Sequence, residues 1–264
     1  DGCVSSIRRR LSVSLIGSLL SSYNATRSML DLKIFEVLVT IERRFRVNIS
    51  SLGPLVFGAQ ARDNYEKLAK LGKFLHVKLT PNEVVKDYID GSTLWSTVIH
   101  CDRQTVHDTF YDIRFVLRLA SSLVYPGSEL NCRLFVERNL LALAFVSQST
   151  PDADTRRVGA FLLQRFLNLL MELKSEDFPE KSLFVYLIRL YKNSVTEEAQ
   201  KISHMVSHFF ARVTKLTLNP GHELYAPVWA FLTLRAYIES DENVAMIRSR
   251  RCVCEEATDI VGLP

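Results

Sequence analysis

Apolar residues recur every three or four positions along most of this chain, and this spacing constrains the fold more than any other feature. It places apolar side chains along one side of an α-helix. Only 10 Gly and 8 Pro occur among 264 residues, so helix-breaking residues are scarce. The clearest predicted helices cover residues 28–42, 112–123, 130–148, 150–173, 179–191, 196–218 and 222–233, with one or two shorter helices between 67 and 90. The predicted fold class is all-α.

Several predicted helices begin or end at recognisable capping residues. Ser28 and Asp31 form a variant of the capping box, ahead of an apolar stripe that starts at Leu30. Thr150 is predicted as an N-cap, with Pro151 at the first helical position. The segment 219–221, Asn-Pro-Gly, ends the most regular helix, which is predicted to start near residue 196.

Roughly ten helices joined by short connections predict stacked antiparallel pairs, as in an α-solenoid of HEAT or armadillo type. The expected division is a basic N-terminal lead at 1–10, a single helical-repeat domain at 11–240 and a loosely held C-terminal tail at 241–264. No apolar run approaches the roughly 18–20 residues of a membrane helix, so no membrane partner is expected.

The charge is mildly basic, with 33 Lys and Arg against 29 Asp and Glu, a net charge of +4. That value permits a nucleic-acid partner without requiring one. The arginines cluster at 8–10, 43–46, 156–157 and 248–251. Arg43 and Arg44 end one predicted helix, where cations suit the helix dipole. Arg156 and Arg157 lie in a first turn, where the dipole disfavours them. These four arginines are the candidate contacts for RNA or a protein partner.

Motifs of catalysis and cofactor binding are missing. The chain has no glycine-rich phosphate loop and no Gly-x-Ser-x-Gly elbow. Asp152 and Asp154 are better explained as acids at a helix start than as metal ligands. His204 and His208 are better explained as solvated residues of one helix than as a metal-binding pair.

The five cysteines are scattered, and Cys252-Val253-Cys254 lacks the second pair of ligands that a zinc site needs. An odd, scattered set of cysteines is typical of a reducing compartment. No cofactor, no catalytic residue, no metal ligand and no small-molecule substrate are therefore predicted.

Two segments carry a resemblance to a known family. Residues 111–117 (YDIRFVL) and 132–143 (CRLFVERNLLAL) resemble the C-terminal domain of the nucleolar pre-ribosomal-associated protein 1 family. Further similar segments occur along the chain in the order that the family has them. They are residues 22–26, 54–58, 187–194, 219–225 and 231–232.

The resemblance implies a large helical-repeat scaffold of the nucleus and nucleolus, without catalytic activity. It implies a role in early assembly of the large (60S) ribosomal subunit and in pre-rRNA processing, including maturation of 5.8S and large-subunit rRNA. The implied partners are other pre-60S assembly factors, among them a second large nucleolar scaffold and an RNA helicase, together with pre-rRNA. The alternatives are a helical-repeat adaptor between proteins with no link to RNA, and a metal-dependent enzyme.

Overall fold

Helices make up most of the computed structural model, which describes residues 13–45, 57–58, 79–101, 107–174 and 176–234. The helices are α2 (Val13–Ser21), α3 (Met29–Phe45), α5 (Pro81–Asp87), α6 (Gly91–Ile99), α7 (Ile113–Leu123), α8 (Cys132–Glu137), α9 (Leu140–Val146), α10 (Ala153–Glu172), α11 (Lys181–Asn193), α12 (His204–Thr217) and α13 (Tyr225–Thr233), with a short 3-10 helix, η2 (Ser147–Ser149). The prediction of an all-α fold is confirmed. The solenoid arrangement stays a prediction, as do the domain boundaries near residues 10 and 240, which lie outside the described residues.

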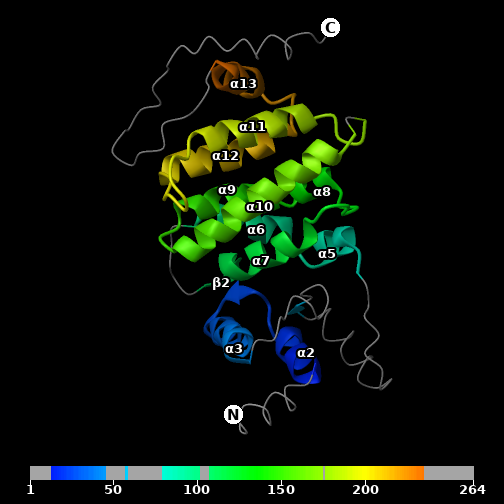
Figure 1. Cartoon of the computed structure of the whole chain (residues 1–264), viewed down its shortest axis with the longest axis vertical. Helices are drawn as coiled ribbons and strands as arrows, with labels where there is room; N and C mark the ends of the chain where they lie inside the picture. The colour runs from blue at the N-terminus through cyan, green and yellow to red at the C-terminus, as the bar shows by residue number, and fades with distance from the viewer. Residues whose placement is uncertain (1–12, 46–56, 59–78, 102–106, 175, 235–264) are drawn as a thin grey trace.

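The described helices are layered along the long axis of the molecule, with α2 and α3 at one end and α13 at the other (Figure 1). A small antiparallel sheet, β1 (Thr26–Arg27) and β2 (His107–Tyr111), lies near the α3 end. The backbone N–H of Asp112 donates to the Ala25 carbonyl at 2.6 Å. This sheet therefore joins the α2–α3 end to the start of α7.

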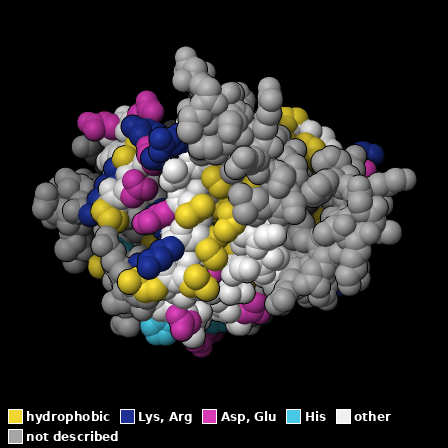
Figure 2. All heavy atoms as spheres, turned by 90° about the horizontal axis from the view of Figure 1, so that it is seen from below, with side chains coloured by type: hydrophobic (Ala, Val, Ile, Leu, Met, Phe, Trp, Pro, Cys, Tyr) yellow, Lys and Arg dark blue, Asp and Glu magenta, His cyan; other side chains and the backbone are white. Residues whose placement is uncertain are grey.

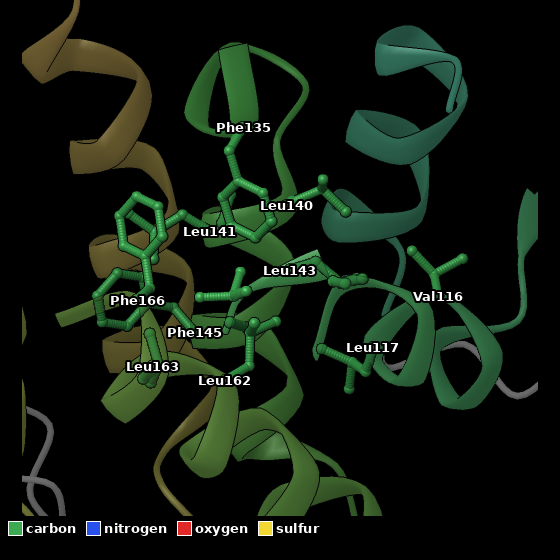
Figure 3. Packing of buried hydrophobic residues seen from close by; sticks show 14 of the residues in the cluster. Val116, Leu117, Phe135, Leu140, Leu141, Leu143, Phe145, Leu162, Leu163 and Phe166 are labelled. Carbon is green, nitrogen blue, oxygen red and sulfur yellow. The ribbon is translucent and has the colours of Figure 1, made fainter. Parts of the chain in front are cut away.

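Helix α9 forms the centre of the core, because each of its seven residues is fully buried. Figure 3 shows Leu140, Leu143 and Phe145 of α9 among side chains of neighbouring helices. The Phe145 ring stacks on Phe210 of α12 at 5.4 Å and meets Tyr191 of α11 edge-on at 5.2 Å. Helices α9, α11 and α12 thus share one apolar core.

The prediction of a continuous helix over 130–148 was wrong. Asn139 has a φ of 66° and separates α8 from α9. Its side-chain amide donates to the Gly91 carbonyl at 2.8 Å, which holds the break against the start of α6. Asparagine adopts this left-handed conformation more readily than most residues. Because α9 is apolar on every side, periodicity did not reveal where it begins.

The prediction that a helix starts near residue 196 was also wrong, since α12 begins at His204. Ala199 has a φ of 54°, which a continuous right-handed helix does not allow. The backbone N–H of Thr196 donates to the Gln200 side chain at 2.9 Å, so this segment forms a turn. Ile202 is nevertheless buried, and its N–H donates to the Gln148 carbonyl.

Helix α10 begins two residues later than predicted. Its N-cap is Asp152, not Thr150, because the Asp152 carboxylate accepts hydrogen bonds from the N–H groups of Asp154 and Thr155. A carboxylate at this position also faces the positive end of the helix dipole. The interpretation of Asp152 and Asp154 as acids at a helix start agrees with this geometry.

The start of α3 follows the predicted capping box in part. The Ser28 hydroxyl accepts from the Asp31 N–H at 3.1 Å. The Asp31 carboxylate is buried and accepts instead from the N–H groups of Asn24 and Thr26, at 3.1 and 3.0 Å. Leu30, predicted to face the core, is 63% exposed, so the apolar stripe of α3 begins one turn later.

Other predictions met mixed outcomes. Pro81 starts helix α5, with Thr80 as its N-cap in a complete capping box. Phe57 is buried. Neither α6 nor the small sheet was predicted. Several parts of the sequence lie outside the described residues. They are the basic clusters at 8–10 and 248–251, Cys3, Cys252, Cys254, residues 46–56 and residues 67–78.

Candidate partner-contact surface

A groove of about 790 Å³ lies between α3, the first turns of α7 and the first turns of α10. Its apolar lining comes from Phe35 and Val39 of α3, Leu117 of α7 and Val158 of α10. Seen from the α2–α3 end, hydrophobic side chains lie beside basic and acidic ones on the surface (Figure 2). The groove therefore combines an apolar lining with charges of both signs.

Arg114 lies in the wall of this groove and is held by Asp112. Its Nε and Nη2 atoms donate to the two carboxylate oxygens of Asp112 at 3.0 and 2.6 Å. The guanidinium also lies 4.6 Å from the centre of the Phe35 ring. The hydrogen bond to Asp112 raises the pKa of Arg114, and the charges of Asp112 and Asp152 act in the same direction. Two-point pairing fixes the plane of this cation.

Arg118, Glu42 and Asp152 of the groove are also engaged. Arg118 of α7 forms an ion pair with Glu42 of α3, which joins these two helices across the groove. The Thr155 hydroxyl is the main cause of the lowered pKa of Asp152, and backbone N–H groups add to the effect. Asp152 therefore remains a carboxylate at neutral pH, and most of the groove's charge is neutralised by fixed neighbours.

Two of the predicted contact residues end α3, as expected. Arg43 lines the groove, and Arg44 lies beside it in the last helical turn. Both side chains are exposed. Across the part of the chain that the structure describes, neither arginine forms an ion pair.

Arg156 and Arg157 are engaged within the chain. Arg156 donates to the carbonyls of Thr150, Pro151 and Ala199 at 2.6–2.8 Å, and so ties the start of α10 to the turn before α12. Arg157 pairs with Asp154 at 2.9 Å and approaches Glu198 at 3.8 Å. The groove thus brings Arg43 near residues of α7 and α10, and its lining includes neither Arg156 nor Arg157.

His204 and His208 begin α12 with ring centres 4.0 Å apart. His204 is exposed, as predicted, whereas His208 is half-buried. Among the residues that the structure describes, no group of three or more His, Cys, Asp or Glu side chains is placed to hold a metal ion. Cys132 is buried and Cys101 half-buried.

Sequence reasoning missed the residues that shape the groove and a second surface feature. Arg114 and Arg118 were overlooked because neither belongs to a run of basic residues. A stack of three rings, His100, Phe110 and His107, was overlooked because it depends on the unpredicted strand β2. The Thr-Phe-Tyr run within β2 was the available signal, since these residues favour strands.

No described helix has the length and apolar character that crossing a membrane requires.

Comparisons with known proteins give matches over most of the chain. The family described as nucleolar pre-ribosomal-associated protein 1 matches residues 141–249. The human protein of that name is 24% identical over 85% of this chain, and the mouse protein is also 24% identical over 85%. No solved structure matches the chain significantly.

The chain spans only about a tenth of the length of these relatives, 10% of the human and 11% of the mouse protein. Their shared name supports the nuclear, nucleolar location that was predicted. These matches confirm the predicted resemblance: over most of its length, the chain is similar to a part of the nucleolar pre-ribosomal-associated protein 1 family.

Proposed function

We propose that this chain is a non-catalytic scaffold domain that associates with pre-ribosomal particles in the nucleolus. The observation that carries the proposal is the match, over 85% of the chain, to relatives named as nucleolar and pre-ribosomal-associated. The finer parts of the proposal are early assembly of the large (60S) subunit and processing of pre-rRNA to 5.8S and large-subunit rRNA.

The groove beside α3 suits contact with a protein partner. Its apolar lining offers surface that a partner would remove from water, which is the main source of favourable free energy in association. Arg114 and Arg118 are already paired with Asp112 and Glu42. A phosphate would have to compete with those carboxylates, so these two cations favour a protein segment over an RNA backbone.

Arg43 and Arg44 complement the groove at its edge. They carry the charge that an acidic side chain or an rRNA phosphate would pair with. Protein contact through the groove and phosphate contact through these two arginines fit one scaffold. Arg156 and Arg157 remain candidate contacts through the sides of their guanidinium groups that face solvent. Their hydrogen bonds and ion pairs within the chain give them a structural role first.

The proposed partners are other pre-60S assembly factors, including a second large nucleolar scaffold and an RNA helicase, with pre-rRNA as a further contact. A second candidate function is a helical-repeat adaptor between proteins that has no link to RNA. The charge pairing within the groove is the observation that favours this alternative. We propose no catalytic activity, and the names of the relatives describe a nucleolar, pre-ribosomal association rather than a reaction.

The test is co-sedimentation. The protein that carries this chain is tagged in its own cells, and nuclear extracts are separated on sucrose gradients. Large-subunit precursor RNA is then measured in each fraction and in the tag-purified material. We expect the tagged protein to sediment and purify with that RNA. Purification without precursor RNA, together with a cytoplasmic location, would support the adaptor instead.

A pair of charge-reversal variants tests the surface. Arg43→Glu reverses a cation at the groove edge, and Arg212→Glu makes the same change on the exposed side of α12. We expect Arg43→Glu to reduce particle association several-fold and Arg212→Glu to leave it unchanged. Equal behaviour of the two variants would remove the groove from the proposal.

A further inference from the structure

Three aromatic rings form a stack at the surface beside the sheet. The Phe110 ring lies between His100 and His107, with ring centres 5.0 and 4.7 Å away and interplanar angles of 25° and 31°. His100 and Phe110 are half-buried, whereas His107 is exposed. The stack therefore starts inside the protein and ends in a ring that faces solvent.

Two of these rings are held in place by hydrogen bonds. The Nδ1 of His100 is 2.9 Å from the Ser96 carbonyl of α6. The Nδ1 of His107 is 2.8 Å from the Thr109 hydroxyl, and the Thr109 N–H points to the same nitrogen at 3.4 Å. Because the outer imidazole is oriented before anything binds, a flat ligand would lose less conformational freedom on stacking there.

The angles of this stack differ from those of a nearby core cluster. Phe57 meets Tyr23, Tyr111 and Phe115 edge-on, at angles of 62–88°. The rings of the surface stack are closer to parallel, as are the core rings Phe145 and Phe210. Near-parallel rings are also the geometry in which successive nucleobases stack. Aromatic side chains on strands receive bases in the same way in many modules that bind single-stranded nucleic acid.

A cation lies next to the exposed end of the stack. In the small sheet, Arg27 of β1 is the residue opposite His107 of β2. Ring and cation together are the two groups that single-stranded sites use for base and backbone.

We propose that the His107 end of this stack binds a nucleobase of single-stranded RNA. The choice of RNA as the ligand rests on the proposed function, whereas the stacking geometry does not. A paired base is already covered by its neighbours on both faces. The site is therefore expected to discriminate against duplex RNA.

The experiment uses the 264-residue chain and a labelled single-stranded RNA of about 12 nucleotides, with one 2-aminopurine, at about 0.1 M salt. Binding is followed by fluorescence anisotropy, and stacking by quenching of the 2-aminopurine. His107→Ala removes the outer ring, and His107→Phe keeps an aromatic surface. His222→Ala removes another exposed imidazole, in the turn before α13.

We expect the chain to bind the single strand and to quench the probe. His107→Ala should weaken binding about tenfold and abolish the quenching, a typical effect of removing one stacking ring. His107→Phe and His222→Ala should stay within about twofold of the original chain. Duplex RNA of the same sequence should bind more weakly and be unaffected by His107→Ala.

Several results would overturn the stacking site. They are absence of RNA binding, unchanged affinity in His107→Ala, an equal loss in His107→Phe, and equal binding of duplex RNA. Since His107 is exposed, its removal should not unfold the chain, and circular dichroism checks this. Particle association is measured separately with Arg43→Glu, so either proposal can fail while the other stands.

Discussion

Among the described glycines that have close neighbours, Gly159 is the one where an added methyl group meets the closest atoms. It lies in α10 against η2. A Cβ atom at this position would come within 1.9 Å of the Ser147 Oγ and 2.4 Å of the Gln148 Nε2. Both neighbours are buried, so neither can move into solvent. Gly159→Ala therefore forces the 3-10 helix away from α10.

The expected magnitude is the difference between one gain and two losses. Alanine is favoured over glycine inside a helix by about 1 kcal/mol. Overpacking a close contact costs roughly 1–3 kcal/mol. The displaced Gln148 amide also loses its 3.0 Å hydrogen bond to the Arg156 carbonyl, and an unsatisfied buried amide costs roughly 1–3 kcal/mol. The net result is a loss of about 1–5 kcal/mol.

Urea denaturation followed by circular dichroism measures the free energy of unfolding. A loss of about 1–5 kcal/mol corresponds to a melting temperature lower by roughly 2–20 °C in a chain of this size. Gly91→Ala is the matched control, because the nearest atom to its added Cβ is 3.5 Å away, an ordinary contact. If Gly159→Ala were as stable as the original chain, the packing of α10 on η2 would be wrong.

Three further predictions concern buried or capping groups. Asp152→Ala should destabilise the chain by about 1–2 kcal/mol at neutral pH. Because the folded-state pKa of Asp152 is lowered, this loss of stability should shrink as the pH falls below about 4. Urea titrations at several pH values would show the change. Burial raises the pKa of the Cys132 thiol to about 11, so iodoacetamide at about pH 8 should modify this thiol only after the chain unfolds. Peptide mass spectrometry detects the modification, and fast modification of the folded chain would contradict the prediction. Asp31→Ala should cost about 2–4 kcal/mol in urea denaturation, since the N–H groups of Asn24 and Thr26 lose their acceptor, and an unchanged midpoint would refute that role.

The sequence predicted the helices that have one apolar side. The stripe of α10 through Leu162, Phe166 and Leu170 is buried as expected. The same reasoning failed for α9, where every position is apolar and periodicity is absent. It failed again before α12, because the positive φ of Ala199 is imposed by tertiary contacts, among them the hydrogen bond from Arg156.

The sheet and α6 escaped prediction for a different reason. Strand β1 has two residues, and β2 has five, of which three are exposed. A pair of strands this short shows little alternation of polar and apolar residues. Its stability comes from contacts with other elements. One such contact is the hydrogen bond from the Tyr111 N–H to the Thr97 hydroxyl of α6.

Proximity in sequence proved a poor guide to which cations could meet a partner. Arg156 and Arg157 are neighbours, yet the first donates only to backbone carbonyls and the second pairs with carboxylates. Arg114 and Arg118 belong to no cluster, but α7 places both in the groove that Arg43 also lines. A cation attracts a partner's anion only to the extent that its own chain leaves it unpaired. Among the cations that line the groove, Arg43 at the end of α3 is the one that forms no ion pair with a described residue.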